Sequence, residues 1–273
     1  MRRDLSGRVV LVTGASRGIG RRAAERLGQE GVRLALASRS GGELESLAKR
    51  IRDGGTEVEA FPADLTDAAA REGLIRDVVA RFGGLDVLVN CAGVASFGEF
   101  ATSSEAVLRR VMEVNFFVAA EMIRLAQPHL LQSATAGRRP AIVNVASICG
   151  RCGIPSLPEH CGSKHALVGL TEALRGEFAR YDIDVLLVLP GVVRSDDLNR
   201  HLLRNEGKIY LNFEGAQRPE EVGESVVRSL VKNRTEAAVG FVSWWVWFGK
   251  RFFPRVPRWV MHRKARRWAR KHG

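Results

Sequence analysis

Ser147, His160 and Lys164 are the residues of this chain whose types and spacing are best suited to chemistry. Ser147 lies thirteen positions before His160, and Lys164 lies four positions after it. A hydroxyl, a titratable imidazole and an ammonium group are typical of proton transfer when a strand end and the first turns of the next helix bring them together. The sequence therefore predicts an acid–base site built on these three side chains.

A glycine-rich turn at residues 13–20 follows the first apolar run of the chain. Its glycines are spaced more widely than in the G-x-G-x-x-G pattern. Glycine lets the backbone approach a pyrophosphate, and the helix that starts here offers free N–H groups and the positive end of its dipole. Because the turn follows a strand pattern and opens a helix pattern, it predicts a dinucleotide site. The residues expected to form it are Thr13, Gly14, Ser16, Arg17, Gly18, Ile19 and Gly20.

The end of the second predicted strand indicates which dinucleotide binds. Ser38, Arg39 and Ser40 stand where an NAD site would place an Asp or Glu for the ribose hydroxyls. Arg39, with Arg17 in the glycine turn, can instead hold a 2′-phosphate through a bidentate guanidinium fork. The alternative is that both arginines are solvated surface groups. The pattern favours NADP(H).

Strand and helix patterns alternate from residue 8 to residue 189. Short apolar runs are typical of buried parallel strands, and longer stretches with one apolar face are typical of helices. Repeated units of this kind predict an α/β fold, a Rossmann-type doubly wound parallel sheet in a single domain. The predicted strands are 8–13, 32–37, 57–61, 85–89, 141–145 and 185–189. The predicted helices are 17–30, 43–52, 67–82, 104–131 (capped by Ser103 or Ser104) and 159–181.

Composition and charge narrow the class of protein. The chain has 273 residues, 45% of them hydrophobic, which is enough for a sizeable core. The net charge is +12, but ten of the 42 Lys and Arg residues lie in 248–273, which has no acid, so the remainder carries 32 basic and 30 acidic side chains. We expect no secretory leader, no spanning helix and a cytoplasmic setting.

Four cysteines raise the question of a metal or redox site. Cys149 and Cys152 form one short CxxC spacing, which Cys91 and Cys161 could complete. A structural zinc site usually pairs two such spacings. We therefore expect buried thiols and no metal.

These motifs together resemble the short-chain dehydrogenase/reductase family over about residues 5–235. The marks beyond the glycine turn are Asp64 and Leu65 after the third strand, Asn90, Ala92 and Gly93 after the fourth, Asn115, Ser147, Lys164, and Pro190, Gly191, Val193 and Ser195. The resemblance implies a carbonyl or alcohol substrate and a homodimer or homotetramer. It also implies residue roles: Asp64 binds the adenine, Asn115 holds a relay water, Ser147 binds the substrate oxygen, and Lys164 binds the nicotinamide ribose. The other marks would line the cofactor.

His160 departs from the family, whose pattern at this point is Tyr-x-x-x-Lys. Tyr181 is too far along the helix to replace the missing phenol, and Tyr210 falls in the region that covers the substrate in this family. Three interpretations of His160 stay open. It is a working acid/base with an altered pH dependence, or the mark of a protein that has left redox turnover, or an engineered substitution.

The C-terminal segment differs in composition from the rest. All five tryptophans lie in residues 244–268, interleaved with Lys and Arg. Tryptophan beside basic residues is typical of a membrane interface, and each basic residue near an anionic surface contributes about 1 kcal/mol. A single-stranded nucleic acid is the less favoured partner, and a substrate lid or an oligomer contact is the remaining alternative. We therefore divide the chain into a domain at 1–240 and a basic, Trp-rich extension at 241–273.

The sequence as a whole predicts an NADP-dependent oxidoreductase that interconverts a carbonyl and an alcohol on an apolar, lipid-like substrate, with activity impaired or altered by His160. The alternative function is a non-redox, cofactor-binding scaffold or sensor, or an enzyme of other chemistry on the same fold. In either case we expect a cytoplasmic protein that is peripheral on the membrane.

Overall fold

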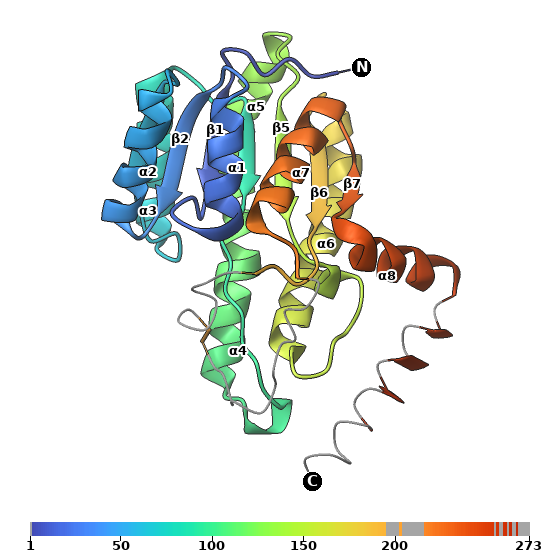
Figure 1. Cartoon of the computed structure of the whole chain (residues 1–273). Helices are drawn as coiled ribbons and strands as arrows, with labels where there is room; N and C mark the ends of the chain where they lie inside the picture. Colours follow the sequence, from blue (N-terminus) through green and yellow to red (C-terminus); the bar gives the residue numbers. More distant parts are fainter. Residues whose placement is uncertain are drawn as a thin grey trace.

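One parallel sheet organises the molecule (Figure 1). The computed structural model describes residues 2–194, 202–203, 216–253, 255–256, 259–260, 262–263 and 266. Within these residues seven strands are ordered β3-β2-β1-β4-β5-β6-β7. Their bounds are β1 Val9–Thr13, β2 Arg33–Ser38, β3 Val58–Pro62, β4 Val87–Asn90, β5 Ala141–Val145, β6 Asp184–Leu189 and β7 Glu236–Ala238.

The strand order reverses beside β1, which fixes the position of the site. β1 pairs with β2 on one side, with Val10 opposite Leu34, and with β4 on the other, with Val10 opposite Val87. The chain therefore winds outward from the centre in both directions. Ligands of such sheets bind at the carboxyl ends of the strands where the order reverses.

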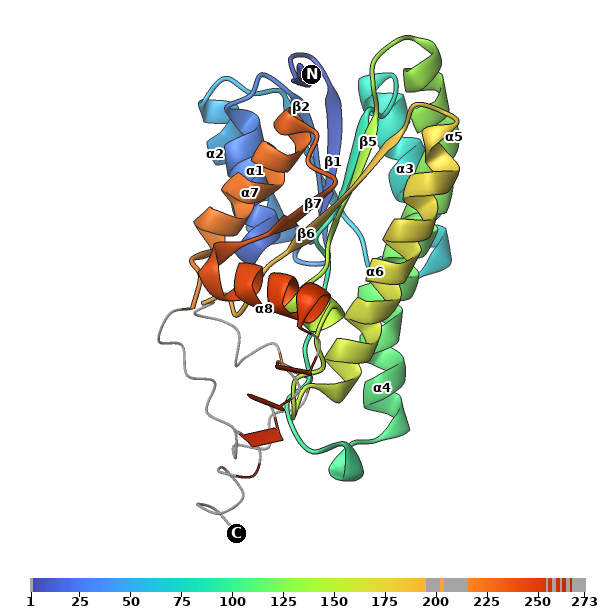
Figure 2. The ribbon, with the colours of Figure 1, turned by 90° about the vertical axis from the view of Figure 1, so that its right-hand side faces the viewer.

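Helices cover both faces of the sheet (Figure 2). α1, α2 and α7 lie on one face and α3, α5 and α6 on the other, while α4 and α8 lie toward one end of the sheet. Their bounds are α1 Gly18–Gly28, α2 Gly41–Asp53, α3 Ala68–Phe82, α4 Glu105–Met112, α5 Val118–Thr135, α6 Pro158–Ala179, α7 Pro219–Lys232 and α8 Gly240–Phe252. In the described part of the chain no helix is both long and apolar enough to cross a bilayer.

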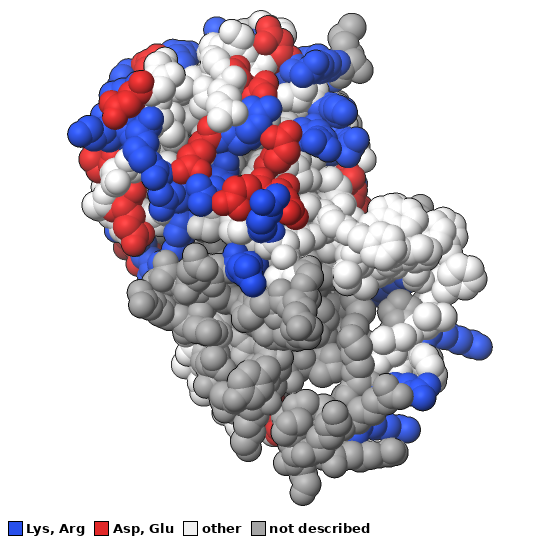
Figure 3. All heavy atoms as spheres, in the orientation of Figure 1, with Lys and Arg blue, Asp and Glu red and all other residues white. Residues whose placement is uncertain are grey.

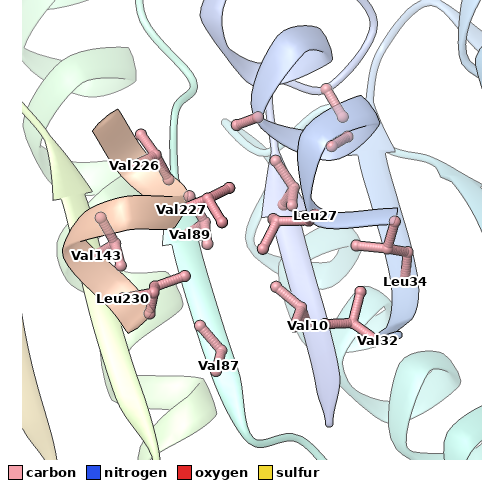
Figure 4. Close-up of a cluster of buried hydrophobic side chains, with 14 of the residues drawn as sticks. Val10, Leu27, Val32, Leu34, Val87, Val89, Val143, Val226, Val227 and Leu230 are labelled. Carbon is pink, nitrogen blue, oxygen red and sulfur yellow. The ribbon is translucent and has the colours of Figure 1, made fainter. Parts of the chain in front are cut away.

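The core between the sheet and α1 and α7 is built from branched aliphatic side chains (Figure 4). Leu27 of α1 and Leu230 of α7 are fully buried in one cluster with Val10 of β1, Leu34 of β2 and Val89 of β4. Burying one such side chain stabilises the fold by roughly 1.5–3 kcal/mol. This packing places α1 against the sheet, and the glycine turn joins β1 to that helix.

The predicted doubly wound sheet is confirmed, and all of the predicted strands and all but one of the predicted helices occur within a few residues of their expected bounds. The predicted helix 104–131 is wrong as one regular helix, because a π-helical turn at Glu113–Phe117 (η2) separates α4 from α5. Ser104, one of the two predicted caps, caps α4 and accepts a hydrogen bond from the Val107 amide at 3.4 Å. Sequence periodicity did not predict α7, β7 and α8, which follow residues 204–215, outside the described residues.

Candidate functional site

A cavity of about 420 Å³ lies at the carboxyl ends of the central strands. Most of the predicted site residues line it: Gly14, Ser16, Arg17, Gly18, Ile19, Gly20, Arg39, Asp64, Leu65, Ala92, Gly93, Ser147, His160, Lys164, Pro190, Gly191 and Val193. Three others, Thr13, Asn90 and Asn115, are buried behind the cavity wall. Ser195 lies outside the described residues, as does Tyr210.

The glycine turn forms a cradle that admits no side chains. Gly14 has φ +66°, and a Cβ there would lie 2.8 Å from the Cα atom of Ala92. Gly18 has φ +53°, a left-handed conformation that other residues rarely adopt. A Cβ on Gly20 would lie 2.3 Å from the carbonyl oxygen of Gly14. The backbone therefore stays open where α1 begins, so its first N–H groups can reach a phosphate.

Two buried polar side chains hold this cradle from behind. The Thr13 hydroxyl accepts hydrogen bonds from the amides of Cys91 at 3.2 Å and Ala92 at 3.3 Å, which ties the end of β1 to the loop after β4. The Asn90 side chain donates to Asn144 at 2.9 Å. Thr13 and Asn90 thus position the cavity wall without lining it.

Basic side chains gather at the end of the cavity beside β2. Arg39 and Arg110 line it together with Arg17 and with Asp64, which is the one carboxylate among the described lining residues. Burial opposes ionisation of Asp64, but hydrogen bonds from the amide and hydroxyl of Thr66 and the charges of Arg39 and Arg110 outweigh it and lower the pKa of the carboxyl. This end therefore carries an excess of positive charge at neutral pH.

The residues present fit a nicotinamide dinucleotide. The cradle and the start of α1 would hold its pyrophosphate. The Ser38 hydroxyl, buried at the end of β2 and lining the cavity, has no hydrogen-bond partner among the described residues. Buried polar groups are rarely left unpaired, so this hydroxyl is consistent with a ligand at this end.

The ring of His160 is fixed by a backbone carbonyl. Its Nδ1 lies 3.2 Å from the carbonyl oxygen of Val94. A carbonyl can only accept, so Nδ1 carries the hydrogen and Nε2 of the neutral ring is bare. Burial and the positive charge of Lys164 lower the pKa of His160 to about 4, against the smaller opposing effect of the Val94 carbonyl. At neutral pH the nitrogen left for a substrate is therefore a proton acceptor, not a donor.

Lys164 lies one helical turn beyond His160 and is buried. Burial lowers the pKa of its ammonium group to about 8, against the opposing effect of the Cys91 and Cys149 thiols. Its Nζ donates a hydrogen bond to the Val145 carbonyl at 3.2 Å. The amine is thus still mainly protonated at neutral pH, and its charge adds to the effect of burial in lowering the pKa of His160.

Asn115 controls the position of the carbonyl that holds His160. Its Oδ1 accepts from the Val94 amide at 2.8 Å, and its Nδ2 donates to the Val94 carbonyl at 3.0 Å and to the Ser163 hydroxyl at 2.9 Å. That hydroxyl in turn donates to the His160 carbonyl at 2.9 Å. The π-helical turn aims Asn115 at the loop after β4, and π turns are common at functional sites. Asn115 therefore holds both Val94 and the turn that carries His160.

Ser147 stands at the end of β5, on the wall of the cavity. Its Oγ accepts from the Cys149 amide at 3.1 Å and lies 3.4 Å from the Pro190 carbonyl. The short 3₁₀ helix that it caps, η3 (Ile148–Gly150), packs against α6 so closely that a Cβ on Gly150 would lie 2.6 Å from the Lys164 carbonyl. The loops after β5 and β6 thus place Ser147 in one wall with His160 and Lys164.

Gln217 is a site residue that sequence reasoning missed. Its Oε1 accepts from the Gly191 amide at 3.0 Å, and its Nε2 donates to the Val239 carbonyl. It therefore joins the loop after β6 to the residue that precedes α8. No local sequence signal predicts this contact, since Gln217 lies 26 positions beyond Gly191. Arg110 was also missed, and Ser38 was named at the end of the second strand but was given no part in the site.

The cysteines are all free thiols, three of them buried. A hydrogen bond between Cys149 and Cys161 lowers the pKa of Cys161 to about 7, aided by the Ile154 amide and opposed by burial, and raises the pKa of Cys149. Among the described residues no three His, Cys, Asp or Glu side chains form a group that could hold a metal ion.

Comparison with known proteins gives a consistent result. A family model described as short chain dehydrogenase matches residues 8–206. The chain is 33% identical over 271 residues to 11-beta-hydroxysteroid dehydrogenase A of Sesamum indicum, covering 94% of this chain and 75% of that protein.

Solved structures show the same fold. A short chain dehydrogenase/reductase from Burkholderia phymatum in complex with NAD has a TM-score of 0.76 at 26% identity, covering 85% of this chain and 89% of the other. An alcohol dehydrogenase from Thermococcus sibiricus complexed with 5-hydroxy-NADP has a TM-score of 0.73 at 27% identity, covering 83% and 91%. The chain therefore belongs to the short-chain dehydrogenase family, whose chemistry is redox between alcohols and carbonyls with a nicotinamide dinucleotide.

Proposed function

We propose that this protein is an NADP(H)-dependent oxidoreductase whose His160 suits it to alcohol oxidation and makes it a poor carbonyl reductase. The observation that carries this proposal is the contact of His160 Nδ1 with the Val94 carbonyl. It leaves Nε2 of the neutral ring as the proton acceptor of a residue that lines the cavity. Oxidation needs a group that takes a proton from the alcohol, whereas reduction needs one that gives a proton to the carbonyl oxygen.

In this mechanism the chain's own residues bind the alcohol and move its proton. The Ser147 hydroxyl binds the substrate oxygen, and His160 Nε2 accepts the hydroxyl proton. Lys164 would hold the nicotinamide ribose, and burial together with the Lys164 charge lowers the pKa of His160, so the ring is unprotonated until it takes the proton. Asn115 positions the Val94 carbonyl. When bound, the oxidised nicotinamide accepts the hydride that the alcohol carbon loses, so one hydride and one proton leave the alcohol and a carbonyl remains.

Support for an apolar, lipid-like substrate comes from the lining near the proton-transfer residues. Phe97, Ile154, Leu157 and Val192 line the cavity on this side. Apolar walls with a few placed polar groups are typical of small-molecule sites.

Support for NADP(H) over NAD comes from charge at the β2 end. Arg17 and Arg39 line the cavity, and no carboxylate follows β2 directly. A charge-assisted hydrogen bond to phosphate contributes roughly 1.5–3 kcal/mol. The positive charge at this end therefore favours a cofactor with a 2′-phosphate over one with a free ribose hydroxyl.

The second candidate function is a non-redox scaffold or sensor that binds the cofactor without turnover. The observation in its favour is the low pKa of His160, about 4, because it makes the neutral ring a weak base and leaves almost no protonated ring at neutral pH. The cofactor cradle does not depend on His160, so binding would persist in this case.

We also propose where and with what the protein assembles. The division into a domain at 1–240 and an extension at 241–273 follows the change in composition, and the basic extension would place a cytoplasmic protein on anionic membranes. Self-association as a dimer or tetramer is typical of the family, and sedimentation velocity tests it.

A turnover screen tests the proposed function. Purified protein is incubated with NADP⁺ and a panel of apolar secondary alcohols, and separately with NADPH and the matching ketones, while NADPH absorbance is followed. Oxidation without appreciable reduction at pH 7 is the expected result. Cofactor binding by calorimetry with no turnover in either direction would favour the scaffold, and no binding of NADPH would refute both functions.

A further inference from the structure

α8 is fixed to the rest of the molecule by one of its sides. Ser243 is fully buried, and its Oγ would lie 2.7 Å from a Cβ placed on Gly191. The Trp247 indole donates to Glu236 of β7 at 2.7 Å, and its ring packs against the cluster that contains Ala146. The buried packing of Ser243 and the hydrogen bond of the half-buried Trp247, one turn apart, set the orientation of the helix. Its other side cannot turn inward without breaking them.

The other side of α8 exposes large apolar side chains to solvent. Phe241 is 75% exposed, Trp245 49% and Phe252 57%. The rings contact one another along the helix. The ring centres of Phe241 and Trp245 are 5.9 Å apart, and those of Phe248 and Phe252 are 4.6 Å apart. Trp244 stacks on Phe248 with their ring centres 5.2 Å apart. We call Phe241, Trp244, Trp245, Phe248 and Phe252 the aromatic face. A contiguous patch of this kind on a folded helix marks an interaction surface.

The charges around the aromatic face have one sign. No Asp or Glu occurs after Glu236, while ten Lys and Arg residues follow the start of α8. Lys250 and Arg255 are exposed, and the Arg263 guanidinium lies 5.1 Å from the Trp259 ring centre. Figure 3 shows a mostly uncharged surface at α8 beside a body where basic and acidic residues alternate. Aromatic rings flanked only by basic side chains match the headgroup region of an anionic bilayer.

We propose that the aromatic face of α8 is the surface through which this protein docks on an anionic membrane. This rests on the membrane association proposed above and assigns it to named residues of a folded helix rather than to the basic segment alone. A second copy of the chain is the less fitting occupant, because it would bring two segments of about ten positive charges together, and like charges repel at short range.

The attachment of α8 also defines the class of molecule that the cavity receives. Gln217 joins Gly191, which lines the cavity, to Val239 just before α8, and Ser243 of α8 packs against Gly191. With α8 in the headgroup layer, the loop beside the site lies one helix diameter, ~10 Å, from the membrane-facing rings. The substrate that fits this placement is an apolar alcohol or ketone dissolved in the membrane.

Tryptophan fluorescence provides the test, because all five tryptophans lie in residues 244–268 and none in the body of the domain. The full chain is mixed with phosphatidylcholine vesicles that do or do not contain phosphatidylserine, with brominated phosphatidylcholine as the quencher. The test variant is Phe241→Ser/Phe252→Ser, which keeps every tryptophan. The matched control is Phe100→Ser, which removes an exposed phenylalanine (63% exposed) far from α8 in the sequence. Thermal melts and NADPH binding confirm that each variant is folded.

The expected result is a blue-shifted, bromine-quenched emission with anionic vesicles, and vesicle partitioning that falls about tenfold or more in the double variant while the control matches the parent. If the double variant binds as the parent does, the aromatic face is not the docking surface, although membrane association through the basic segment stands. If the parent binds no vesicles, both the membrane association of the 241–273 extension and docking through the aromatic face are refuted. The oxidoreductase proposal does not depend on this result. Sedimentation that shows a dimer lost in the double variant would assign the face to a second copy and overturn the proposal.

Discussion

The pH dependence of His160 gives the sharpest prediction, because the two directions of the reaction need opposite protonation states. Reduction requires the imidazolium, since only then does Nε2 carry a proton for the carbonyl oxygen. Oxidation requires the neutral ring. The pKa of His160 is lowered to about 4 by burial and by Lys164. The neutral ring therefore predominates throughout the physiological range.

The magnitude follows from the fraction of protonated ring. With a pKa of about 4, that fraction is ~10⁻³ at pH 7 and ~10⁻¹ at pH 5, so reduction should be about 100-fold faster at pH 5. A histidine with its ordinary pKa near 6.5 would gain only about fourfold over the same interval. Oxidation should instead be nearly independent of pH from about 5 to about 8, where Lys164 begins to lose its proton.

The assay is a pair of initial-rate profiles from pH 5 to pH 8, one for each direction, with cofactor saturating. The companion variant is His160→Tyr. A phenol stays protonated at neutral pH and Lys164 lowers its pKa toward the working range, so we expect neutral-pH reduction to rise at least tenfold. NADPH affinity should stay the same, since His160 does not form the cofactor cradle. NMR titration of the His160 ring measures its pKa independently of turnover.

Two results would refute this reasoning. The first is rapid carbonyl reduction at pH 7 together with a lower rate in His160→Tyr. Histidine would then be an effective general acid at this position. The second is a pH 5 to pH 7 ratio near four, which would show that neither burial nor Lys164 perturbs the ring.

Further predictions concern the cofactor cleft and the stability of the fold. Arg39→Ala should weaken NADPH binding about tenfold and leave NADH binding unchanged in calorimetry, and Arg76→Ala, on an exposed helix face, should change neither; equal NADH and NADPH affinities in the parent would contradict the cofactor assignment. Gly14→Ala should abolish NADPH binding, because its Cβ would lie 2.8 Å from Ala92 Cα, whereas Gly169→Ala, which meets no atom within 4 Å, should not. Gln217→Ala should lower the unfolding free energy by ~1–3 kcal/mol, since the Gly191 amide and the Val239 carbonyl lose their partner. Gln132→Ala, at an exposed position, provides the control. An unchanged melting temperature of the Gln217 variant would refute this role. Because the folded pKa of His160 lies below its unfolded value near 6.5, its contribution to stability is present above pH 6.5 and is lost as the pH falls toward about 4, a slope that His160→Gln should reduce in acid melts.

The sequence by itself determined the fold class and the cofactor cleft. Buried parallel strands appear as continuous apolar runs, and the glycine turn has a local cause that spacing reveals, since Gly14 and Gly20 stand where any Cβ would meet the backbone. The membership of Ser147, His160 and Lys164 in one site also follows from the sequence, because strand ends and helix starts meet at one edge of a parallel sheet.

Only the tertiary structure decided what His160 can do and where α8 lies. The tautomer depends on the Val94 carbonyl, 66 positions away, and on the π-helical turn that aims Asn115 at it. Contacts between residues far apart in the chain also decide two other features. They are the hydrogen bonds of Gln217 to the loop after β6, and the side of α8 that is buried. Periodicity reports which residues are apolar, but a helix with aromatic residues on several sides buries one of them only when a particular partner such as Gly191 or Glu236 is in place.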